Sequence, residues 1–248
     1  MRTNKVLLIL RKDIAETFRN KLIYLYTVFF VIFGLSYLGT FSSTINSLAA
    51  QNLSFEDFKL AIHLSIDFMF ANIPLSISML TCSIFSAYSV SLEKANRNME
   101  SLLATPISVG QVWLGKSLAV AIPSIIISVI ISFLVLCGIN SKISDYFNAF
   151  VFPSALSLVT SLIIVPLMIF LINLLVNLIQ MITTNQIIGR LIFIGVFILT
   201  FSPTALLGLN SLNSVALLYI LACVVLVIAV VLVKLFLTKE RVILSSKG

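Results

Sequence analysis

The chain has 248 residues, of which 60% are hydrophobic and only 10% are charged, and its formal net charge is +7. A chain of this composition has too little polar surface to coat a water-soluble globule. The basic excess does not indicate a nucleic-acid partner, because the basic residues lie between long apolar runs, where membrane proteins meet anionic headgroups. The partner that the composition indicates is a lipid bilayer.

Residues 5–20 are predicted to form an amphipathic helix along the inner membrane surface. Its apolar and polar residues repeat at helical spacing on two different sides. The apolar side holds Leu7, Leu10, Ile14 and Phe18, and the polar side holds Arg11, Lys12, Glu16 and Arg19. An ordinary extension of the first membrane span is the alternative.

Six long apolar runs follow, at about 22–42, 67–90, 113–138, 152–179, 191–209 and 214–233. Each is long enough to cross a hydrocarbon layer of about 30 Å as a helix. The runs lack the period-two alternation of barrel strands, so we expect an all-α polytopic membrane protein. No linker or soluble domain interrupts them, which predicts a single transmembrane domain over residues 1–248. The expected spans are about 22–42, 67–90, 113–138, 152–179, 187–202 and 214–237.

The loop between the second and third spans is predicted to hold a second short amphipathic helix, residues 91–104. Thr105 and Pro106 end it, because the residue before a proline leaves the helical region. Its apolar stripe includes Leu92, Met99 and Leu102. Nothing in the chain is assigned to cover this stripe, so the helix either lies on the lipid surface or inserts into a groove on a partner.

Residues 110–117 fit the phosphate-binding pattern G-x-x-x-x-G-K-[ST]. The fit is rejected as an ATP site, because the intervening residues are bulky, no buried strand precedes them and a membrane span follows. Trp113 and Lys116 are interpreted instead as interfacial anchors at the start of the third span.

Two stretches in the second half of the chain are unusual for membrane spans. Asn173, Asn177 and Gln180 share one helical face, which indicates either interhelical hydrogen bonding or a polar lining for a translocation path. Residues 200–212 are apolar but broken by Pro203 and Gly208. This break predicts a re-entrant hairpin in the outer leaflet between spans five and six.

The distribution of basic residues predicts the orientation. Of the 16 Lys and Arg residues, all except Lys59 and Lys142 fall before the first run, in alternate loops, or after the last run. The positive-inside rule therefore places both termini in the cytoplasm, with an even number of spans.

No catalytic, metal or cofactor site is expected. The only histidine, His63, has no second histidine or carboxylate cluster at metal-ligand spacing. The spans carry no ionisable group near their middle, which is where ion-coupled carriers place one. If the protein moves a solute uphill, the energy is expected to come from a partner subunit, so the chain itself is not predicted to be an enzyme.

The layout resembles the type-2 permease subunits of ATP-binding-cassette (ABC) transporters. It is similar in the N-terminal amphipathic helix, the six spans and the cytoplasmic segment before the third span. That family shows an acidic residue, a Glu-x-Leu-Leu stretch, a proline and a Gly-Lys pair. Here these are Glu93, Glu100-Ser-Leu-Leu103, Pro106 and Gly115-Lys116.

The resemblance implies that residues 5–20 are an elbow helix and that residues 91–104 are a coupling helix that fits a cleft in a separate ATPase. The implied ATPase-docking residues are Leu92, Glu93, Arg97, Met99, Glu100, Leu102 and Leu103. Members work as dimers of identical or paralogous permeases with two ATPase subunits. The family further implies the plasma membrane of a prokaryote and export of a peptide, drug or other amphiphile.

Three other functions remain open from the sequence. A secondary carrier or channel would move solute without ATP or a partner. A membrane enzyme or assembly factor would need nucleophiles or metal ligands that converge in the spans. A non-transporting immunity or scaffold protein could use the same fold.

Overall fold

The computed structural model describes residues 5–51, 54–91, 93, 106–144, 150–183, 191, 194–195, 212–235, 237–238 and 242. Each secondary-structure element in these ranges is a helix, as the apolar runs predict. Two elements, η1 and η2, are π-helical turns that continue a neighbouring α-helix. In chain order the elements are α1 (Lys5–Arg19), α2 (Lys21–Ala49), α3 (Phe55–Ser86), η1 (Ala87–Ser91), α6 (Val109–Ile143), α7 (Ala155–Val159), η2 (Thr160–Ile164), α8 (Val165–Ile182) and α10 (Leu212–Lys234).

Among the described residues, five helical stretches are long and apolar enough to cross a membrane. They are Ile23–Ala49, Phe55–Ser86, Val109–Ile143, Ala155–Ile182 and Asn213–Lys234. This confirms an all-α chain whose helices suit a multi-pass membrane protein, and the five correspond to expected spans one to four and six. Most of the expected fifth span at 187–202, of the hairpin at 200–212 and of the helix at 91–104 lies outside the described residues.

Two of the spanning helices begin earlier than their apolar runs, because polar caps set their ends. The third helix of the chain, α3, begins at Phe55, where the Ser54 side chain accepts a hydrogen bond from the backbone N–H of Asp57. α6 begins with a capping box in which Ser108 and Gln111 exchange side-chain to backbone bonds. Hydropathy detects only the apolar part of a helix, so it missed these first turns.

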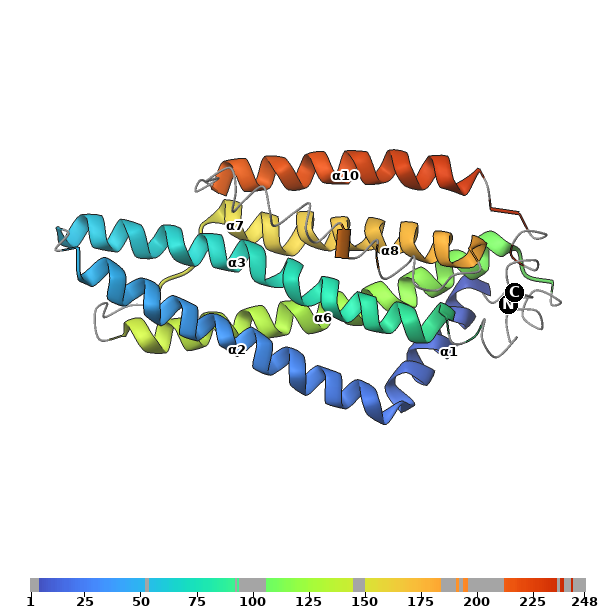
Figure 1. Ribbon diagram of the computed structural model, residues 1–248, viewed down its shortest axis with the longest axis horizontal. Coiled ribbons are helices and arrows are strands. Elements are labelled where there is room, and N and C mark those ends of the chain that lie inside the picture. Colours follow the sequence, from blue (N-terminus) through green and yellow to red (C-terminus); the bar gives the residue numbers. More distant parts are fainter. Residues whose placement is uncertain are drawn as a thin grey trace.

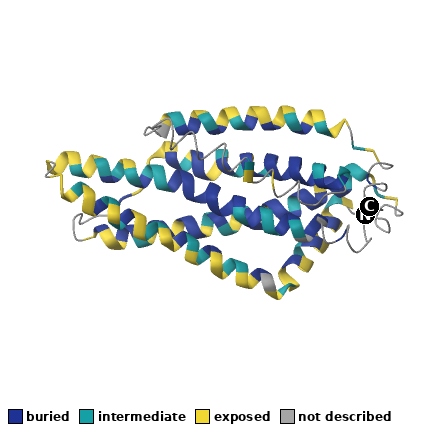
Figure 2. Ribbon diagram, viewed as in Figure 1, coloured by how far each residue is buried: buried dark blue, intermediate teal, exposed yellow. Residues whose placement is uncertain are grey.

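The helices form an elongated bundle with α3, α6 and α8 at its centre (Figure 1). α2 packs on α3 and α6, and α10 packs on α8. Burial is concentrated on the central helices, whereas α2 and α10 expose long apolar faces (Figure 2). Leu25 of α2 is 65% exposed and Leu221 of α10 is 66% exposed, as expected of helices that meet lipid chains.

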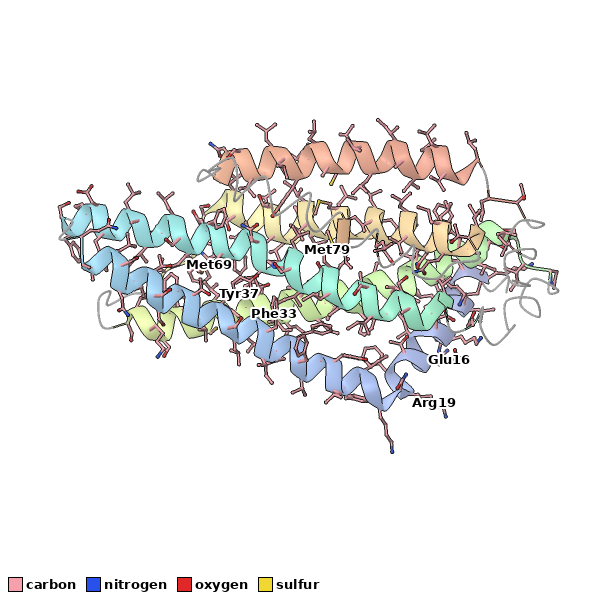
Figure 3. All side chains as sticks on the ribbon, in the orientation of Figure 1. Glu16, Arg19, Phe33, Tyr37, Met69 and Met79 are labelled. Carbon is pink, nitrogen blue, oxygen red and sulfur yellow. The ribbon has the colours of Figure 1, made fainter. Side chains whose placement is uncertain are left out.

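Polar side chains join the spans at mid-bundle. On α2, the ring of Phe33 packs edge-to-face on Tyr37, with centroids 5.9 Å apart (Figure 3). The Tyr37 hydroxyl donates to Ser76 Oγ of α3 at 3.0 Å. The buried Tyr219 hydroxyl of α10 donates to Asn72 Oδ1 of α3 at 2.6 Å. These bonds fix α2 and α10 relative to α3, where lipid would offer no alternative partner.

α1 lies across one end of the bundle, which we call the α1 end (Figure 1). Gln180, near the end of α8, bonds to Ser86 at the end of α3, and this contact places the end of α8 at the α1 end. Lys234, at the end of α10, lies over Trp113 in the first turns of α6. α8 and α10 therefore run in the same direction, and both finish at the α1 end.

Candidate functional site

The close docking of α1 on α6 forms the base of the candidate site. α1 buries Ile9, Asp13 and Thr17, which are spaced four residues apart and so share one face. Opposite them, α6 presents Gly115. A Cβ atom at this position would lie 2.9 Å from Ile9 Cβ and 3.3 Å from the carbonyl oxygen of Val6. The glycine lets the two helices approach closely enough for buried side chains to meet.

Lys116, the residue after this glycine, is the centre of a buried ionic cluster. Its side chain is fully buried. Its Nζ atom lies 2.9 Å from Asp13 Oδ2, 3.0 Å from the Ser89 carbonyl oxygen and 2.6 Å from Glu93 Oε2. An ammonium group has three N–H donors, and these three acceptors use all of them. One side chain thus joins α1, η1, α6 and the residue at 93.

Asp13 has a second hydrogen-bond partner in Ser89. Its Oδ2 atom also accepts a hydrogen bond from Ser89 Oγ at 3.2 Å, and the residue is only 4% exposed. Burial raises the pKa of Asp13 above its ordinary value of 3.8, while Lys116 and the Ser89 hydroxyl oppose the rise. Burial dominates because a carboxylate loses its hydration there, and the nearby charge of Glu93 adds to the effect.

A second ammonium group borders the cluster. Lys12 Nζ lies 3.6 Å from Glu93 Oε1 and 3.6 Å from Glu16 Oε1. Oxygen atoms of Asp13, Glu16 and Glu93 lie within 4.8 Å of one another, a spacing that three ligands of one cation could have. Here Lys12 and Lys116 neutralise these carboxylates, so we interpret the group as an ion-pair network.

A second polar cluster lies beside the first and joins α3, α6 and α8. Ser86 Oγ lies 2.8 Å from Asn177 Oδ1 and 2.9 Å from Gln180 Oε1. Asn177 Nδ2 donates to Ser117 Oγ at 3.2 Å, and Asn173 Nδ2 donates to the Ser117 carbonyl oxygen at 2.5 Å. Asn173 Oδ1 is buried and accepts no hydrogen bond from the described residues. Ser117 directly follows Lys116, so the two clusters share one turn of α6.

Trp113 fixes the end of α10 to the same region. It is 4% exposed, and its indole N–H donates to the Leu174 carbonyl oxygen at 2.9 Å. Lys234 Nζ lies 5.9 Å from the centroid of its ring, within range of a cation–π contact. The expectation that Trp113 and Lys116 are interfacial anchors is wrong for Lys116, whose buried ammonium pairs with carboxylates and does not extend to headgroups.

The phosphate-binding pattern at 110–117 has a structural explanation. The segment is α-helical from Val109 onward. Gly115 contacts α1, Lys116 forms the ionic cluster and Ser117 bonds to α8. The three residues that resemble the end of a phosphate-binding loop thus each contact a neighbouring helix.

The structure describes only part of the set of residues singled out from the sequence. Of the implied ATPase-docking residues, Glu93 belongs to the ionic cluster, and the other six lie outside the described residues. Asn173, Asn177 and Gln180 are brought together as their spacing predicts, and they form hydrogen bonds between helices. Their lining of a translocation path stays a prediction.

Sequence reasoning missed Asp13 and Ser89, and it misplaced Lys116. A signal for Asp13 exists, because it sits between Ile9 and Thr17 at four-residue spacing, on the side of α1 that carries neither Arg11 nor Arg19. An acidic residue in that position needs a buried cation, and Lys116 begins an otherwise charge-free apolar run.

Gly115→Ala should weaken the docking of α1, because the new Cβ meets a β-branched side chain and a backbone oxygen. We expect a loss of about 1–3 kcal/mol in the free energy of unfolding, typical of an overpacked contact. Unfolding in mixed detergent micelles measures it. The matched control is Gly110→Ala in the same helix, where nothing lies within 4 Å. Equal stability of the two variants would contradict the close contact.

Lys116→Met should leave Asp13 buried without a cation and Glu93 with only the more distant Lys12, and it should lower the free energy of unfolding by about 3–5 kcal/mol. The same micelle titration measures this loss. The triple variant Lys116→Met, Asp13→Leu, Glu93→Leu should recover much of it, because no charge then remains buried unpaired. A single variant as stable as the wild type would show that the cluster is not the buried contact described above.

The raised pKa of Asp13 sets the direction of a pH effect. Its contribution to stability is present below pH 3.8, the ordinary pKa, and is lost as pH rises through the higher pKa of the folded state. The wild type should therefore lose stability relative to Asp13→Asn as pH rises above 3.8. Melting temperatures across that window test this, with exposed Asp57→Asn as the control. A constant difference between wild type and Asp13→Asn would contradict the shift.

No protein-family model, curated protein or solved structure matches this chain. Its membrane character follows from the five apolar helices. Its candidate site follows from two linked polar clusters at the α1 end of the bundle, one ionic and one built from amides and hydroxyls.

Proposed function

We propose that this chain is the membrane-spanning permease subunit of an ATP-driven exporter of the ABC type, working with a separate ATPase subunit. The observation that carries the proposal is that α1 holds both borders of the segment 94–105. Lys12 pairs with Glu93 before the segment, and Lys5 Nζ donates to the Pro106 carbonyl oxygen after it. A segment that receives a mechanical push from a partner needs such fixed borders.

The ionic cluster supports transmission of that push into the spans. Lys116 connects Glu93 directly to α6 and to α1. One residue further along α6, Ser117 bonds to Asn173 and Asn177 of α8. A displacement at 91–104 would therefore reach two candidate spans, α6 and α8, through hydrogen bonds and an ion pair. Packed interfaces of this kind switch between discrete arrangements.

The direction of the helices supports a sixth span. α8 ends at the α1 end of the bundle, while α10 begins at the opposite end (Figure 1). The chain from 184 to 211 has to connect these two ends, and Leu191, Ile194 and Gly195 within it are helical. A crossing there would give the even number of spans that the basic residues predict, with a re-entrant hairpin at 200–212 completing the connection.

In this proposal the α1 end faces the cytoplasm of a prokaryotic cell, where the ATPase is available. ATP-driven closure of two ATPase subunits moves the coupling helices at 91–104, and the spans of two permease copies, or of one copy and a paralogue, open a path between them. Asn173, Asn177 and Gln180 would change partners during this movement. A peptide, drug or other amphiphile is the proposed cargo, because the spans offer apolar surface and no mid-span charge.

Changes of charge within residues 91–104 test the proposal. Glu100→Lys and Met99→Asp should each reduce ATP hydrolysis and transport by the co-expressed complex at least tenfold, because a docking surface rarely tolerates an unpaired charge. Glu56→Lys, an exposed residue at the other end of the bundle, is the control. ATPase activity of complexes in vesicles measures the effect.

The test can fail in three informative ways. Coupling at the wild-type level in both variants would remove the docking assignment. Transport of solute by the chain alone, in vesicles without ATP, would indicate a secondary carrier or channel. A chain that binds an ATPase but never stimulates it would indicate a non-transporting protein with the same layout.

A further inference from the structure

The helix α1 has three distinct faces, and only one of them is buried against the bundle. Its buried face carries Asp13 and packs on α6. A second face is apolar and largely uncovered: Leu7 is 59% exposed and Phe18 is 43% exposed, with Leu10 and Ile14 half-buried between them. The position of α1 across the end of the bundle leaves this face open to the surroundings (Figure 1).

The apolar face of α1 continues into the exposed surface of α2. The Tyr24 hydroxyl of α2 donates to the Phe18 carbonyl oxygen at 2.9 Å, so the two surfaces meet at the corner between the helices. On the α2 side the surface continues through Leu25, Val28 and Phe29, each more than half exposed. α2 is a candidate membrane span with few buried residues, so the environment that covers it also reaches α1.

The third face of α1 is basic. Arg11 and Arg19 are exposed, and neither forms an ion pair with a described residue. Arg19 lies on the outside of the corner where α1 meets α2 (Figure 3). Lys21, at the start of α2, is exposed beside it. The acidic residues of α1 pair with lysines and not with these arginines: Asp13 pairs with the buried Lys116, and Glu16 pairs with Lys12. The exposed charge next to the apolar face is therefore positive.

We propose that α1 is a binding site for anionic phospholipids. Leu7, Leu10, Ile14 and Phe18 enter the boundary between headgroups and acyl chains, and the guanidinium groups of Arg11 and Arg19 bind the headgroup phosphates. The continuity with α2 identifies the occupant as a bilayer and not a protein. The two arginine side chains favour anionic over zwitterionic lipid. The inference does not depend on an ATPase partner.

Fluorescence quenching by brominated lipid tests the site, because Trp113 is the only tryptophan. The reporter is the full chain with Trp113→Phe and Phe18→Trp, in vesicles of phosphatidylcholine with a minor share of phosphatidylglycerol. Bromine is placed on the acyl chains of one lipid at a time. Brominated phosphatidylglycerol should bind at the reporter more tightly than brominated phosphatidylcholine, by roughly fivefold for each basic side chain that contributes. High salt should reduce the preference.

The preference should disappear in the reporter carrying Arg11→Gln and Arg19→Gln, while quenching itself persists. Lys59→Gln, at the opposite end of the bundle, should leave it unchanged. Native mass spectrometry of retained lipid on the chain with Trp113 intact gives a second measurement if the reporter does not fold. Equal binding of both lipids overturns the selectivity. A reporter that neither lipid quenches overturns the lipid site and indicates that a protein covers α1.

Discussion

The fold at the α1 end depends on the ammonium group of Lys116. Taking an ammonium and two carboxylates out of water is costly, and the cost is offset only when every donor finds an acceptor. Asp13 of α1 supplies one of those acceptors, and Ser89 and Glu93, from the stretch that follows α3, supply the other two. A buried ionic group of this kind contributes little net stability, but it accepts only one arrangement of its neighbours. The cluster therefore specifies where α1 docks.

The apolar runs predicted the helical class and the position of five spans, because hydropathy reports the contact with lipid that dominates a membrane helix. The sequence predicted the ends of the helices less well. α3 begins at Phe55 and continues through Glu56, Asp57 and His63 before it becomes apolar. A cap at Ser54 and the packing of Ile62 and Ile66 against the neighbouring helices support that extension, and neither raises mean hydropathy.

The polar contacts also fall into those that the sequence predicted and those that it did not. The spacing of Asn173 and Asn177 predicted one shared face, since helical periodicity is a local property. Their partners were not predictable, because hydroxyl residues such as Ser86 and Ser117 are frequent along these spans and most bond to their own helix. The pair of Asp13 and Lys116 joins residues far apart in sequence, and no local pattern encodes such a contact. Tertiary packing alone brings them together.

The π-helical turn η1 stands between Ser86, which bonds to α8, and Glu93, which bonds to Lys116. A π turn holds one residue more than an α turn, so it shifts the angular phase of everything that follows it. Ser86, before the turn, contacts α8, and Glu93, after it, contacts Lys116 of α6. Loss or gain of a single codon within Ala87–Ser91 would keep the helix yet turn one cluster away from its partners. Among homologues of this protein, insertions and deletions in this short stretch should consequently be rarer than substitutions.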